Sequence, residues 1–121
     1  MQYLLLIYEN ESAGAARSPE EQKTMMKEYF AFNEVAKAGG NYIGGEPLEP
    51  VATATTVRVR DGEVLHTDGP FAETKEQLGG YYLVEASDLD RALELARQIP
   101  AARVGCVEVR PVMVLPDLDS M

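Results

Sequence analysis

The sequence predicts an α+β fold in which two helices cover one face of a mainly antiparallel sheet. Segments typical of strands and helices follow one another in the order strand, helix, strands, strand, helix, strand. An Asp-Gly pair between two strand-like segments also predicts a hairpin, which is an antiparallel connection. The chain has 121 residues, a length that suits one domain.

The first strand is predicted at residues 3–8, where a continuous apolar run with aromatic ends is typical of a strand buried on both faces. Residues 9–17 are polar and contain Gly and Ala, so we expect a loop there. A helix follows this loop, because Ser18 can cap it, Pro19 suits its first turn and Glu21 completes a capping box.

One face of this helix is predicted to pack in the core. Apolar residues at helical spacing form that face and two neighbours widen it, namely Met25, Tyr29, Phe32 and Ala36 with Met26 and Phe30. Met and aromatic side chains at this spacing are more typical of core packing than of a binding site. The pair Gly39-Gly40 ends the helix.

The middle of the chain contains the predicted hairpin. Extended structure at residues 41–45 and a proline-containing loop at 46–50 precede it, and its strands occupy residues 55–60 and 63–67. Asp61-Gly62 suits the two-residue turn between them, because both central residues need positive φ.

This turn fixes the register of the hairpin. Arg60 then pairs with Glu63, Val59 with Val64, and Val57 with His66. Side chains alternate between the faces of a strand, so His66 and Asp68 lie on the same face as these valines.

The last third of the chain supplies a strand, a helix and another strand. The strands are predicted at residues 80–86 and 104–109, and the helix opens at residues 87–90 and stops before Pro100. Its apolar stripe is expected to consist of Leu89, Ala92, Leu93, Ala96 and Ile99. Residues 111–121 form a tail with an apolar start and an acidic end.

The economical arrangement of these elements is a ferredoxin-like plait with a mainly antiparallel sheet. We expect one domain at residues 1–116 and an acidic C-terminal tail at 117–121. Two helices cover only one face of the sheet, yet residues 3–8 and 81–84 are apolar on both faces. A second copy of the chain is the simplest cover for the other face, so the sequence predicts a homodimer.

The composition narrows the classes of partner. Asp and Glu number 20 against 11 Lys and Arg, a net charge of −9, which disfavours direct binding of nucleic acid. The single Cys106 forms no internal disulfide, and the apolar run near the start is shorter than the roughly 20 residues needed to span a bilayer. We therefore expect a cytoplasmic protein with no membrane partner.

Metals and cofactors are not expected either. His66 is the only histidine, which excludes a multi-histidine metal site. The pair Gly79-Gly80 lacks the spacing of a dinucleotide or phosphate loop.

Asp68 is the first candidate for chemistry, as a general acid or base at a strand end, with His66 as a weaker candidate two residues away. Asp68 precedes Gly-Pro, so it is equally well explained as a turn residue that accepts backbone N–H groups. Four further residues are weak candidates for ligand binding. Arg58 could contact an anion, and Phe71 and Tyr81 could form apolar walls. Lys75 lies on a link between strands that could close over a cleft. Tyrosine hydroxyls of a pocket could come from Tyr8, Tyr29, Tyr81 and Tyr82.

Long segments of the chain resemble one family. The segments TATTVRVRDG (53–62) and TDGPFAETKEQLGGYY (67–82) closely resemble the DGPF-domain branch of the YCII-related proteins. MQYLLLIY (1–8), GGEPL (44–48) and VEVRPVM (107–113) are also similar to that branch. The resemblance covers nearly the whole chain.

The resemblance implies a ferredoxin-like fold that assembles as a dimeric α+β barrel. Some YCII-related proteins carry a His and an Asp in a cleft, and Asp68 corresponds to that Asp. The corresponding His lies in the first helix, whereas residues 18–39 of this chain contain none. DGPF-branch proteins also tend to accompany extracytoplasmic-function sigma factors, which implies a sigma-factor regulator as a partner.

Two hypotheses for the function follow. The first is a homodimer with a small-molecule cleft near Asp68, performing cofactor-free acid/base chemistry. The second is a non-catalytic accessory domain that binds a ligand or a regulator. The residues leave open whether the protein is an enzyme.

Overall fold

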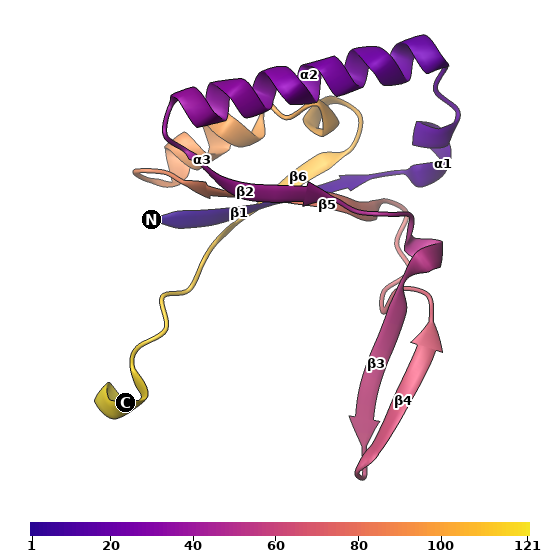
Figure 1. Cartoon of the computed structure of the whole chain (residues 1–121), viewed down its shortest axis with the longest axis vertical. Helices are drawn as coiled ribbons and strands as arrows, with labels where there is room; N and C mark the ends of the chain where they lie inside the picture. The colour runs from indigo at the N-terminus through magenta and orange to yellow at the C-terminus, as the bar shows by residue number, and fades with distance from the viewer.

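A four-stranded antiparallel sheet forms the body of the protein, with the strands in the order β2-β5-β1-β6 (Figure 1). The computed structural model describes all residues from 1 to 121. The four strands are β1 (Gln2–Glu9), β2 (Tyr42–Pro47), β5 (Gln77–Glu85) and β6 (Cys106–Pro111). With two helical crossovers, this order is that of a ferredoxin-like plait, so the predicted fold is confirmed for the single chain.

Two helices, α2 (Pro19–Ala38) and α3 (Leu89–Ala96), cover one face of this sheet (Figure 1). The predicted capping box of α2 is present: the Ser18 hydroxyl accepts from the Glu21 N–H, and the Glu21 carboxylate accepts from the Ser18 N–H. At the start of α3 the Asp88 side chain accepts from the Arg91 N–H, which is a single N-cap bond.

The predicted loop at residues 9–17 contains a short helix, α1 (Glu11–Ala15), which the sequence reading missed. Asn10 caps it, because its side-chain oxygen accepts from the Ala13 N–H at 2.8 Å. The three 3₁₀ turns are η1 (Val51–Thr53), η2 (Pro100–Arg103) and η3 (Leu118–Ser120). None of the helices is both long enough and apolar enough to cross a membrane.

The core lies between the sheet and the two helices. The central strands and α2 supply Tyr3, Leu5, Ile7, Tyr82, Val84 and Phe32, and α3 with the turn after it supplies Leu95 and Ile99. The expectation that Met26 and Phe30 widen the core face of α2 is wrong: their side chains are 59% and 62% exposed.

The apolar stripe of α3 is also different from the expected one. Leu89 and Leu93 are 48% and 45% exposed, and Leu95 is fully buried in their place. The buried line is Ala92, Leu95, Ala96 and Ile99, with the i, i+3, i+4, i+7 spacing of one helical face. Both stripes contain Ala92, Ala96 and Ile99, and they differ in which leucines join them: Leu95 packs in the core, whereas Leu89 and Leu93 face outward.

The second face of the sheet is not covered by any helix. Because side chains alternate along a strand, Leu4 and Leu6 of β1 and Tyr81 and Leu83 of β5 point to this face. All four are half-buried. We call this surface the open face.

The hairpin of β3 (Thr55–Arg60) and β4 (Glu63–Asp68) forms a separate two-stranded sheet that projects from the body on the side of the open face (Figure 1). All three predicted residue pairs of its register are confirmed. At the turn, Asp61 and Gly62 have φ of 52° and 78°, as the Asp-Gly pair requires. The C-terminal tail after Val112 projects on the same side, away from the hairpin.

Candidate functional site

A cleft of about 510 Å³ lies between α2 and the β2–β5 edge of the sheet. Helix α2 contributes Met25, Met26, Tyr29, Phe30 and Asn33 to it. The strands contribute both glycines and larger residues, namely Ile7, Tyr42, Gly45, Glu46, Pro47, Gly79, Gly80, Tyr81 and Tyr82. Arg17 lies at the end where α2 begins. A concave, mostly apolar space with a few polar groups is the usual form of a small-molecule site.

Glycines shape the strand side of this cleft. A Cβ at Gly45 would lie 2.6 Å from the Tyr81 carbonyl oxygen, and a Cβ at Gly80 would lie 3.0 Å from the Glu46 carbonyl oxygen. Only glycine therefore allows β2 and β5 to pair this closely at these positions. The strand side of the cleft also carries side chains, among them those of Tyr42 and Tyr82, which face the wall formed by α2.

Tyr82 and Asn33 form the main hydrogen bond of the cleft. The Tyr82 hydroxyl donates to Asn33 Oδ1 at 2.6 Å, and the Tyr82 ring packs against Phe32 and Tyr42 at centroid distances of 5.0 and 6.2 Å. Burial raises the pKa of Tyr82 to about 12, and the neighbouring Tyr29 and Tyr42 add to the rise. Tyr82 is therefore a neutral hydrogen-bond donor at neutral pH.

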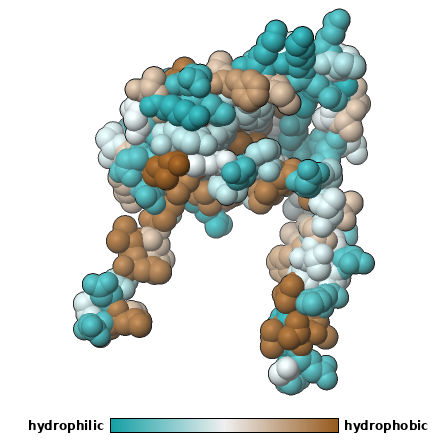
Figure 2. Space-filling model, in the orientation of Figure 1, coloured by the Kyte–Doolittle hydropathy of each residue, from teal (hydrophilic) through white to brown (hydrophobic).

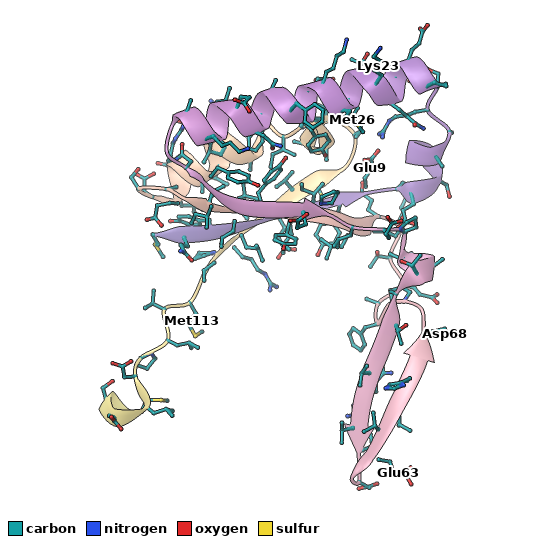
Figure 3. The ribbon with its side chains drawn as sticks, in the orientation of Figure 1. Glu9, Lys23, Met26, Glu63, Asp68 and Met113 are labelled. Atoms are coloured by element: carbon teal, nitrogen blue, oxygen red, sulfur yellow. The ribbon has the colours of Figure 1, made fainter.

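Arg17 and Glu9 form an ion pair at the other end of the cleft. Their side chains are only 20% and 22% exposed, and they lie beside Gly14 of α1, where a Cβ would be in ordinary contact with both at 3.5 Å. Figure 3 places Glu9 beneath α2, on the same side of the sheet as Met26, with Lys23 on the outer surface of the helix. The pair holds the Arg17 guanidinium in place beside the cleft.

Tyr29 of α2 lies between Arg17 and Asn33 in the sequence, and it also lines the cleft. Its pKa is raised mainly by burial and further by the Glu9 carboxylate, while the Ala101 backbone, Arg17 and Arg103 act in the opposite direction. Like Tyr82, Tyr29 keeps its proton at neutral pH. The cleft thus contains phenol, amide and guanidinium groups, with one carboxylate, that of the exposed Glu46, on the strand side.

Of the six site residues predicted from the sequence, Tyr81 alone is among the residues that line this cleft, although its side chain points to the open face. Asp68 and His66 are exposed on β4, opposite Thr55 and Val57 respectively. No hydrogen bond or ion pair involves the Asp68 carboxylate, and Figure 3 shows it on the projecting hairpin, far from Glu9.

The remaining predicted residues lie on the hairpin and the link that follows it. The Arg58 guanidinium lies over the Phe71 ring, 5.5 Å from its centroid, so these two are brought together. Lys75 is exposed, and only its backbone carbonyl is engaged, accepting from Asn10 Nδ2 at 3.1 Å. No group of three or more His, Cys, Asp or Glu side chains is placed to hold a metal ion.

Sequence reasoning missed Arg17, Asn33, Met26 and Phe30 as cleft residues. Tyr29 and Tyr82 had been considered as hydroxyl donors to a pocket, and both reach the cleft. For Met26 and Phe30 a signal was present: they lie beside the core stripe of α2 rather than in it. Asn33 carries no such signal, because a lone asparagine on a helix has the pattern of a surface residue.

The fold and the cleft define a class of small α+β proteins: a ferredoxin-like plait with an inserted hairpin and a cleft beside its longer helix. The chain belongs to the YCII-related family, since the model of the YCII-related domain matches residues 1–116.

The chain is also similar to a second protein in sequence and to a third in structure. The chain is 40% identical over 114 residues to "Uncharacterized protein R00369" of Rhizobium meliloti (strain 1021), which covers 93% of this chain and 92% of that protein. It is also similar to the structure of 5-chloro-2-hydroxyhydroquinone dehydrochlorinase (TftG) from Burkholderia phenoliruptrix AC1100, in complex with 2,5-dihydroxybenzoquinone. That similarity has a TM-score of 0.47 and 16% identity, and covers 93% of this chain and 94% of the other.

Proposed function

We propose that this protein is a small-molecule-binding homodimer whose ligand occupies the cleft beneath α2. The observation that carries the binding proposal is the combination of an apolar wall on α2 with the fixed polar groups Asn33 and Arg17 at its two ends. Met26 and Phe30 are more than half exposed there, and large apolar side chains on a concave surface are typical of a ligand site.

A comparison of two variants of α2 tests this proposal. Met26→Gln makes the wall of the cleft polar, whereas Lys23→Gln changes a residue on the outer surface of the same helix. A library of small aromatic and aliphatic molecules is screened by ligand-observed NMR. We expect binders whose signals weaken with Met26→Gln and are unchanged with Lys23→Gln. Binders that are indifferent to Met26→Gln, or no binders at all, would contradict the assignment of the ligand to this cleft.

The homodimer is supported by the open face and by the two projections beside it. Leu4, Leu6 and Leu83 lie on the open face without a covering helix. The hairpin and the tail extend past this face on either side, and both carry hydrophobic atoms (Figures 1 and 2). A second copy placed against the open face would lie between the two projections and cover apolar surface on both.

The hairpin also needs such a partner for its own stability. Val57, Val59 and Val64 on its one face are 58%, 57% and 62% exposed in the single chain. An isolated two-stranded hairpin is marginally stable in water, and its stability rises when its apolar face is packed. In the tail, Met113, Val114 and Leu115 are more than three-quarters exposed.

Sedimentation velocity at micromolar concentration tests the homodimer. We expect a species of twice the 13.3 kDa chain mass, which dissociates when Val64→Lys places a charge on the apolar face of the hairpin. Ala31→Lys, on an exposed position of α2 outside the cleft, is the matched control and should stay dimeric. A monomeric wild-type protein at this concentration would disprove the homodimer.

Acid/base chemistry at Asp68 is a second candidate function, and it depends on the homodimer. Asp68 does not line the cleft beneath α2, and the Asp68 carboxylate is exposed on the hairpin. A general base needs a substrate within hydrogen-bond reach, and desolvation to raise its pKa. A second copy packed against the hairpin face that carries Asp68 and His66 would shield the Asp68 carboxylate from water and form the other side of a substrate site there.

A further inference from the structure

We propose that the cleft beneath α2 selects neutral aromatic molecules that carry a hydrogen-bond acceptor, such as aryl ketones, and that the Asn33 amide recognises the acceptor. The inference rests on the proposed function, which places a small molecule in this cleft, and deepens it by naming the ligand class. Three features carry it: the side chains of the apolar wall, the orientation of the Asn33 amide, and the charge balance around Arg17.

The apolar wall suits a flat ring. Met25, Met26, Tyr29 and Phe30 lie on successive turns of α2 and all line the cleft. Methionine side chains are flexible and make favourable contacts with aromatic rings, while Phe and Tyr rings add stacking or edge contacts. The strand side of the cleft includes Gly45 and Gly80 together with Tyr42 and Tyr82, whose rings add further aromatic surface for a planar molecule.

The Asn33 amide has a fixed orientation with its donor side free. The one hydroxyl hydrogen of Tyr82 is used on Asn33 Oδ1. Asn33 Nδ2 carries two hydrogens, and no protein acceptor takes either of them, although Asn33 is half-buried and lines the cleft. An acceptor on the ligand is the partner that this amide lacks. Burial keeps Tyr82 protonated, so the arrangement holds at neutral pH.

The charges around the cleft disfavour an anionic ligand. The Arg17 guanidinium is already paired with the Glu9 carboxylate, which neutralises it. The only other ionisable side chain that lines the cleft, apart from the tyrosines, is Glu46, an exposed carboxylate that would repel an anion. A phosphate or carboxylate therefore finds no unpaired cation among the residues that line the cleft, whereas a neutral ketone can accept from Asn33 without a charge penalty.

Three probes of similar size separate these features: indanone, a neutral aryl ketone; indane, the same ring system without the acceptor; and phenyl phosphate, an anion. Each is titrated into the isotope-labelled full chain, and the amide NMR signals of the cleft residues are followed. We expect indanone to bind about five- to tenfold more tightly than indane, the contribution of one net hydrogen bond. Phenyl phosphate should bind most weakly.

Two substitutions assign the difference to the amide. Asn33→Asp retains an oxygen for the Tyr82 hydroxyl but removes the donor, and Asn33→Leu removes both polar atoms. Each should weaken indanone binding to the level of indane and leave indane binding unchanged. The neighbouring Glu34→Gln, which is exposed and outside the cleft, should bind all three probes like the wild type. The NMR spectrum of each variant reports whether it is folded.

The outcomes distinguish this inference from the proposed function. Equal affinity for indanone and indane, or tightest binding of phenyl phosphate, overturns the ligand class while ligand binding in the cleft stands. A preference for indanone that persists in both Asn33→Asp and Asn33→Leu overturns the role of Asn33. If no probe shifts any cleft signal, and the wider screen also finds no binder there, the proposed function itself fails.

Discussion

The Tyr82 hydroxyl, in the middle of the sheet, donates to the Asn33 side-chain oxygen on α2 at 2.6 Å. The two residues are 49 positions apart in the sequence. This bond joins the long helix to the central strand β5 at the inner end of the cleft. The same bond therefore helps to hold α2 against the sheet and fixes the orientation of the Asn33 amide in the cleft.

Removing this hydroxyl should destabilise the protein modestly without unfolding it. Tyr82→Phe retains the ring contacts with Phe32 and Tyr42 but leaves Asn33 Oδ1 without its donor. The expected loss in unfolding free energy is about 1 kcal/mol, measured by urea denaturation at neutral pH. Tyr81→Phe, on the adjacent position and the opposite face, is the control. An unchanged stability of Tyr82→Phe would contradict a bond of this kind.

Stability should also fall at alkaline pH in a way that Tyr82 controls. Its pKa is about 12 in the folded protein, above the ordinary tyrosine value of about 10. Below the unfolded value both states keep the proton, so the contribution of Tyr82 is fully present. Between the two values only the unfolded state releases its proton, so the contribution is lost as the pH rises toward the folded pKa.

Urea denaturation at a series of pH values from about 9 to 11 measures this effect. We expect the unfolding free energy of the wild type to decline over this range, and that of Tyr82→Phe to decline less steeply. Tyr29, whose pKa is also raised, adds to the decline in both proteins and accounts for the part that remains in the variant. Parallel curves for the two proteins would show that Tyr82 is not the group responsible.

Local signals in the sequence predicted those parts of the fold that short segments determine. Asp61-Gly62 fixes the hairpin turn by its need for positive φ, and the register follows from it. Ser18 and Glu21 fix the start of α2 through hydrogen bonds within four residues. The alternation of apolar strands and helices was enough to give the ferredoxin-like order.

The cleft could not be predicted in this way, because it depends on long-range packing. Helical periodicity places Met26 and Phe30 near the apolar face of α2, but whether they are covered depends on what packs opposite them in the complete fold. The partnership of Asn33 with Tyr82 arises only when β5 crosses beneath α2. The motif around Asp68 drew attention to the hairpin, whereas the end of the same motif, Gly79 to Tyr82, reaches the cleft.

The ion pair between Glu9 and Arg17 should contribute measurably to stability, because both side chains are mostly shielded from water. Glu9→Gln and Arg17→Met should each lower the unfolding free energy by roughly 1–2 kcal/mol, between the values typical of exposed and buried pairs. In the double variant the loss should be smaller than the sum of the two, because each single change leaves an unpaired charge.

A double-mutant cycle by urea denaturation measures this coupling. The pair Arg103–Glu28 is a suitable control, since its side chains are 56% and 39% exposed. Arg103→Met and Glu28→Gln should show a coupling of no more than about 0.5 kcal/mol. Strictly additive effects at Glu9 and Arg17 would mean that the pair does not hold Arg17 beside the cleft.

Replacing Asp68 by asparagine separates the cleft beneath α2 from a site at the hairpin. Asp68 is exposed and its carboxylate makes no hydrogen bond, so Asp68→Asn should change the unfolding free energy by less than about 0.5 kcal/mol. Binding of indanone, followed by the NMR signals of cleft residues, should be unchanged because Asp68 does not line the cleft. Glu63→Gln, an exposed residue at the far end of the same strand, is the matched control. Loss of indanone binding in Asp68→Asn alone would instead place the ligand in a site that the hairpin helps to form, and acid/base chemistry at Asp68 would then become the stronger candidate.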